Sequence, residues 1–137
     1  MSTQRFHQYL EAEVLSSDPV KLTHMLYRGA VQAVGEARRS LASGNIRERS
    51  RQITKAWEIV RELAQTLDHA QGGEISRNLA ELYAYIQQRL LDGNAGQSDE
   101  PLAETEKLLT TLSEAWEGVK GLTARVEKAY EPVSCEA

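Results

Sequence analysis

The chain has 137 residues, a formal net charge of -4, and a composition that is 41% hydrophobic and 26% charged. This length fits one soluble domain around one core. The negative charge argues against a nucleic-acid partner, because such binders concentrate positive charge. No stretch approaches the roughly 20 apolar residues that cross a bilayer, and the first residues lack the apolar run of a signal peptide. We therefore expect a cytoplasmic protein without membrane insertion.

The first half of the chain predicts an arm followed by two helices. Residues 1–17 carry no long periodic pattern and are expected to form a flexible arm. Asp18-Pro19 is a helix start signal, and Gly44 is suited to a left-handed helix end. Asn45 is the expected cap of the second helix. We expect that helix to end at the glycine pair of residues 72–73.

The second half predicts two more helices. Beyond the glycine pair, apolar residues recur at steps of three and four and predict one helical stripe: Ile75, Leu79, Leu82, Ile86 and Leu90. Residues 92–101 are polar and rich in glycine, which predicts a loop. The last helix is expected over residues 102–131, with a disordered tail at 132–137 beginning at Pro132.

Four amphipathic helices joined by short links predict an all-α fold, an antiparallel four-helix bundle over residues 18–131. Catalysis finds no support in the motifs. The histidines are His7, His24 and His69, and none has a carboxylate three residues before it, as a di-iron bundle would need. No phosphate-binding loop occurs, and Cys135 is the only cysteine. We expect no catalytic residue, no metal and no cofactor.

Several apolar residues lie outside the predicted core stripes, notably Ile59, Tyr85, Leu108 and Leu122. A wide core face accounts for about half of such residues. The others leave apolar grooves between helices, and such grooves hold amphipathic partner segments. From the residues alone the partner is either another protein or a second copy of this chain, which leaves a homodimer of the free protein possible.

Residues 72–90 read Gly-Gly-Glu-Ile-x-x-Asn-Leu-x-x-Leu-Tyr-x-Tyr-x-x-x-Arg-Leu, a pattern that resembles the hallmark of the FliS family of flagellar export chaperones. Residues 17–30, 55–63 and 108–116 are similar to other helices of that family. Residues after Trp116 match nothing in it.

The resemblance implies a chaperone that binds the C-terminal segment of flagellin, prevents its early polymerisation and delivers it to the flagellar type III export gate. It also implies that Phe6 and Tyr9 of the arm bind the export gate. The residues assigned to flagellin are Ile59, Leu63, Tyr83, Tyr85, Leu108, Ala115 and Leu122.

The alternative is a histidine phosphotransfer module that uses His24. Arg28 then stands one position later than the basic residue of such modules, which rotates it by about 100° around the helix. The simpler interpretation of His24 is a residue on the flank of its helix.

Overall fold

The computed structural model describes the backbone of residues 19–136 and the side chains of residues 19–118. The described chain forms the helices α2 (Pro19–Ser43), α3 (Ile46–Gln65), α4 (His69–Gly96) and α5 (Asp99–Glu136). Residues 19–136 contain no strand, which confirms the all-α prediction. The predicted arm at residues 1–17 lies outside the described residues.

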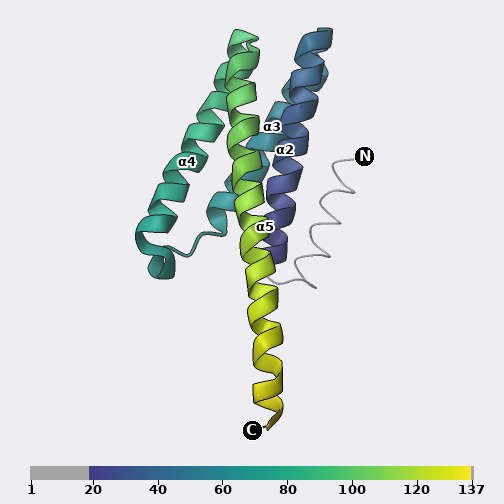
Figure 1. Ribbon diagram of the computed structural model, residues 1–137. Coiled ribbons are helices and arrows are strands. Elements are labelled where there is room, and N and C mark those ends of the chain that lie inside the picture. The colour runs from purple at the N-terminus through teal and green to yellow at the C-terminus, as the bar shows by residue number, and fades with distance from the viewer. Residues whose placement is uncertain (1–18, 137) are drawn as a thin grey trace.

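The helices form an antiparallel bundle (Figure 1). Helix α2 packs on α3 and α5, and α4 packs on the same two helices. Successive helices are joined by two or three residues, which turn the chain back on itself. The core is apolar, with fully buried side chains that include Val34, Ile53, Leu63, Ile86 and Leu109.

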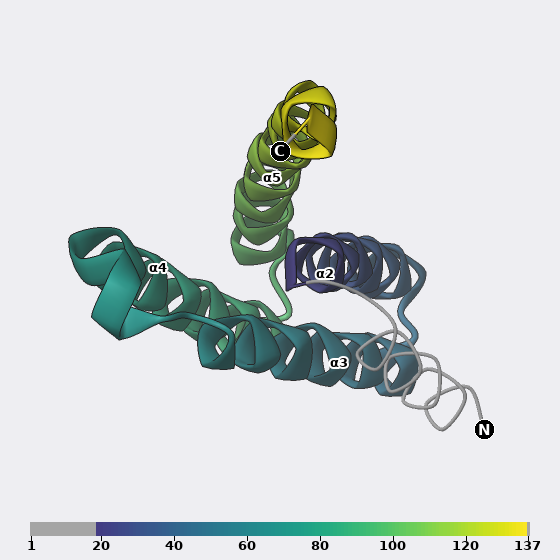
Figure 2. The ribbon, with the colours of Figure 1, turned by 90° about the horizontal axis from the view of Figure 1, so that it is seen from below.

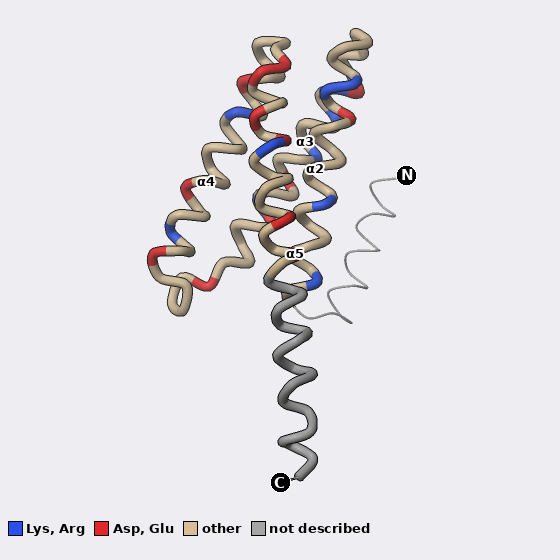
Figure 3. The backbone as a smooth tube through the Cα atoms, in the orientation of Figure 1, with Lys and Arg blue, Asp and Glu red and all other residues tan. Residues whose placement is uncertain are grey.

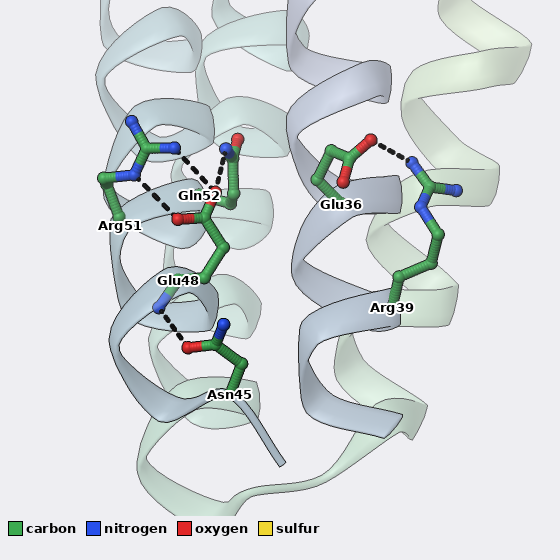
Figure 4. Close-up of polar contacts among 6 residues, drawn as sticks. All are labelled: Glu36, Arg39, Asn45, Glu48, Arg51 and Gln52. Atoms are coloured by element: carbon green, nitrogen blue, oxygen red, sulfur yellow. Dashed lines mark hydrogen bonds and ion pairs between the residues drawn. The ribbon is translucent and has the colours of Figure 1, made fainter. Parts of the chain in front are cut away.

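The turn between α2 and α3 follows the predicted local chemistry. Gly44 adopts a φ of 78°, in the left-handed region. The side-chain oxygen of Asn45 accepts a hydrogen bond of 3.1 Å from the backbone N–H of Glu48. The Glu48 carboxylate in turn accepts bonds from Arg51 and Gln52 (Figure 4). Both the glycine end and the asparagine cap are confirmed.

The boundary between α3 and α4 differs from the prediction. Helix α3 ends at Gln65, and α4 begins at His69, before the glycine pair. Asp68 caps α4, because its carboxylate accepts hydrogen bonds from the N–H groups of Ala70 and Gln71. Gly73 (φ 53°, ψ -122°) then kinks α4. The glycines therefore interrupt a helix that has already started, where the sequence predicted a link between two helices.

The predicted loop at residues 92–101 is also wrong, because α4 continues to Gly96 and α5 starts at Asp99. Tertiary contacts hold this glycine-rich stretch in the helix. The side-chain oxygen of Asn94 accepts bonds from Arg49 (3.0 Å) and Ser50 (3.3 Å) of α3. Only Gln97, with a left-handed φ of 50°, and Ser98 separate the two helices.

Ion pairs join α2 to the first turns of α5, where acidic residues gather (Figure 3). Arg38 donates two hydrogen bonds of 2.8 Å to Asp99 and one of 2.7 Å to Glu106. Helix α5 continues past Pro132 to Glu136, whereas the sequence predicted its end there. A proline removes one backbone donor, and a helix can continue past that loss. None of the helices in the described residues is long and apolar enough to span a membrane.

Candidate functional site

An open apolar groove of about 410 Å³ lies at the end of the bundle where α2 begins. Helices α2, α4 and α5 and the link between α3 and α4 contribute to it. Its lining comes from the first turns of α2, the link between α3 and α4, the first half of α4 and the middle of α5, and includes Val20, Thr23, Tyr27, Leu67, Asp68, Ser76, Leu79, Tyr83, Leu112, Ala115 and Trp116. Most of this surface is hydrocarbon, which suits an apolar occupant rather than a charged small molecule.

The groove has an aromatic floor. The hydroxyl groups of Tyr27 and Tyr83 hydrogen-bond to each other, and the Trp116 ring lies 6.4 Å from the Tyr27 ring. The Trp116 indole N–H donates a 2.9 Å bond to the backbone oxygen of Val20, which ties α5 to the start of α2. Burial raises the pKa of both tyrosines, so both hydroxyls stay neutral at physiological pH.

The groove exists because α4 and α5 diverge from their short connection (Figure 2). The exposure of the apolar stripe of α4 increases with distance from that connection. Leu90 and Ile86, nearest the connection, are fully buried. Leu82 and Leu79 are partly buried, and Ile75 is 71% exposed. The sequence placed all five in one core stripe. For Ile75 that prediction is wrong, because none of the described side chains covers it.

The residues that the sequence assigned to flagellin do not form one surface. Ile59, Leu63 and Tyr83 are each at most 3% exposed. The expectation that Ile59 faces a groove is therefore wrong, since it packs in the core between the helices. Tyr83 is buried but lines the groove floor, and the exposed Ala115 lines its rim.

The other assigned residues lie elsewhere. Tyr85 is 45% exposed, and its hydroxyl donates a 2.8 Å bond to Glu104 across α4 and α5. Leu108 packs partly buried against the core, so it does not face a groove as expected. Leu122, Phe6 and Tyr9 lie outside the residues whose side chains the structure describes.

Sequence reasoning missed most of the groove. The periodic apolar pattern of the last helix includes Leu112 and Trp116, and that of the second includes Leu67, which favours a core position for each. They are partly buried and line the groove. Helical periodicity identifies the apolar face of a helix but not where its neighbour leaves it, so no signal in the sequence separated these residues from the core.

A second hollow, of about 350 Å³, has a different character. It lies between α2 and α5 and is lined by Gly35, Arg38, Arg39, Ala42, Asp99 and Glu106. Its charges already pair with one another, and Arg39 pairs with Glu36 on its own helix (Figure 4). The apolar groove is therefore the better candidate for a binding site.

His24 is engaged in a contact that counts against phosphotransfer. Its Nε2 atom lies 2.7 Å from a carboxylate oxygen of Glu117, and its side chain is only 16% exposed. A phosphoryl group on this nitrogen would displace the contact and place negative charge beside the carboxylate. Among the described side chains, no group of three or more possible ligands could hold a metal ion.

Comparison with known proteins identifies relatives along most of the chain. A family described as "Flagellar protein FliS" matches residues 2–123, so the similarity extends beyond Trp116, where the sequence analysis found none. The flagellar secretion chaperone FliS of Salmonella typhimurium is 37% identical over 111 residues, covering 80% of this chain and 82% of the relative. The flagellar secretion chaperone FliSB of Pseudomonas aeruginosa is 32% identical over 110 residues, covering 80% and 87%. FliS of Bacillus subtilis is 29% identical over 108 residues, covering 79% and 80%.

Proposed function

Because this chain belongs to the FliS family of flagellar secretion chaperones, we propose that it binds the C-terminal segment of flagellin in the apolar groove between α2, α4 and α5. The family consists of chaperones, not enzymes. The chaperone acts in the cytoplasm, keeps flagellin from polymerising before export, and delivers it to the flagellar type III export gate.

The observation that carries this proposal is the groove itself. It is open along the bundle end, apolar, and floored by Tyr27, Tyr83 and Trp116. An amphipathic helix binds by placing its apolar face in such a groove. Segments that pack against one another in a filament have an apolar face of this kind, and covering that face blocks assembly. Ordering a disordered segment on binding offsets part of the contact free energy, which allows release at the gate.

Calorimetry with full-length flagellin and with a version lacking its C-terminal segment tests the partner. We expect a complex with the full-length protein and none with the truncated one. Equal binding of full-length and truncated flagellin would place the recognition site elsewhere on flagellin and contradict the proposal.

A matched pair of variants tests the groove. Ala115→Arg places a long charged side chain on the groove rim, and Ala84→Arg makes the same change at an exposed position of α4 that does not line the groove. Both positions are exposed, so neither change should unfold the protein. We expect Ala115→Arg to weaken flagellin binding at least tenfold and Ala84→Arg to leave it unchanged.

We assign gate delivery to the arm residues Phe6 and Tyr9, which are three apart in the sequence, so that a helical turn would put both rings on one side. The resemblance to the family supports this role. Changing both to alanine should abolish binding to the gate protein while flagellin binding stays equal or becomes slightly tighter. Loss of flagellin binding in the double variant would instead assign the arm to the client site.

A further inference from the structure

The first turns of α4 form a fixed kink at one end of the groove. Gly73 has a φ of 53° and a ψ of -122°, a conformation that side-chain-bearing residues rarely adopt. On either side of it the chain is tied together, because the Ser76 hydroxyl donates a 3.1 Å bond to the backbone oxygen of Asp68. The same oxygen accepts a 2.7 Å bond from the Gly72 N–H. We call residues 68–76 the α4 kink.

Ile75 lies in the α4 kink, next to residues that line the groove. Ser76 and Leu79 both line the groove. Ile75 precedes Leu79 by four residues, so the two side chains leave the helix about 40° apart. Ile75 is 71% exposed, whereas its neighbour Ser76 is 5% exposed. A large aliphatic side chain thus stands in solvent beside the apolar surface of the groove.

The other large exposed hydrophobic residues among the described side chains lie elsewhere. They are Ile46, Tyr85 and Leu91. Ile46 starts α3 and Leu91 is near the end of α4, both at the opposite end of the bundle. Tyr85 has its hydroxyl bonded to Glu104. Of these four residues, Ile75 is therefore the one that directly neighbours a groove-lining residue in the chain.

We infer that Ile75 is a contact residue for the bound segment, held at the groove rim by the α4 kink. This inference rests on the proposed function. The occupant is a helical flagellin segment that extends beyond the groove and places one more apolar side chain against Ile75. The contact lengthens the apolar surface along α4 by one turn.

The test is the affinity for a peptide of the flagellin C-terminal segment, measured by calorimetry for Ile75→Ser and for the matched control Ile46→Ser. Both positions are exposed, so circular dichroism should show unchanged folds. We expect Ile75→Ser to weaken binding about tenfold, below the loss expected for a fully buried isoleucine. The control should bind as the original protein does. Unchanged affinity in Ile75→Ser would overturn the inference.

The role of the kink is tested by Gly73→Ala, alone and combined with Ile75→Ser. An added Cβ at this position meets nothing within 4 Å, so the change acts through the positive φ alone. We expect weaker binding in the original background and no further loss in the Ile75→Ser background. Equal losses in both backgrounds would show that the kink does not act through Ile75.

These outcomes separate the inference from the proposed function. If the peptide fails to bind the original protein, both fall. If it binds, and Ala115→Arg weakens it while Ile75→Ser does not, the groove remains the client site and the inference alone is wrong.

Discussion

The hydroxyl groups of Tyr27 and Tyr83 form a hydrogen bond at the floor of the groove, so each is the other's hydrogen-bond partner. A buried hydroxyl without a partner is costly. No buried side-chain nitrogen or oxygen in the described part of the chain lacks a partner. The pair therefore connects α2 to α4, two helices that otherwise lie diagonally across the bundle. At the residue scale, this bond joins α2 and α4 across the groove floor.

Removing one hydroxyl of the pair should cost more than removing both. Tyr83→Phe leaves the Tyr27 hydroxyl buried without a partner, which should lower the free energy of unfolding by about 1–2 kcal/mol. The double change to phenylalanine leaves no such group, so its cost should be smaller than the sum of the two single costs. Urea unfolding followed by circular dichroism measures all three variants. Strict additivity would show that the two hydroxyls do not depend on each other.

Glu48 offers a test by titration at the start of α3. Hydrogen bonds from Arg51 and Gln52 lower the pKa of its carboxyl group from 4.5 to about 2. Because the pKa is lower in the folded protein, the stabilisation by these contacts is complete above 4.5 and is lost as the pH falls toward 2. NMR titration of the carboxyl carbon should give a midpoint near 2. Arg51→Gln should move it back toward the ordinary value, and an unchanged midpoint would exclude Arg51 as the main cause.

At the scale of single elements, local chemistry predicted some boundaries and not others. The end of α2 at Gly44 and the Asn45 cap depend on a few neighbouring residues, and both were predicted. The continuation of α4 through residues 92–96 depends on α3, because Arg49 and Ser50 bond to Asn94. Composition gave a loop there because glycine, asparagine and aspartate favour loops in the absence of such contacts. Long-range contacts can override local preferences.

Two glycines near the end of α4 test this explanation. A Cβ on Gly93 would lie 2.7 Å from Leu102 of α5, whereas a Cβ on Gly96 meets nothing closer than 3.9 Å. Gly93→Ala should therefore lower the free energy of unfolding by about 1–3 kcal/mol through overpacking. Gly96→Ala should leave it equal or raise it by up to about 1 kcal/mol, since alanine favours the helix. Thermal unfolding of the two variants measures both effects. A Gly93→Ala protein more stable than the original would show that α4 and α5 are not in close contact here.

At the scale of the whole molecule, the sequence predicted the bundle but not where it opens. Periodicity marked an apolar stripe on each helix, and a stripe has the same pattern whether a neighbouring helix or a groove faces it. Ile59 was thus placed at a surface and is buried, while Ile75 was placed in the core and is exposed. The divergence of α4 from α5 accounts for the error at Ile75. Where the two helices diverge, Tyr83 of α4 and Ala115 and Trp116 of α5 line the same groove.

The proposed occupant of this groove is the flagellin segment, and the two tryptophans of the chain allow a direct test of its binding there. Trp116 lines the groove, and its indole N–H donates a hydrogen bond to the backbone oxygen of Val20. Trp57 lies on α3 with the Arg61 guanidinium 5.8 Å from its ring centre, and it does not line the groove. Each indole N–H gives its own signal in a ¹⁵N-labelled NMR spectrum. On titration with the flagellin C-terminal segment, the Trp116 signal should shift and the Trp57 signal should stay in place. A shift of Trp57 with Trp116 unchanged would contradict the account.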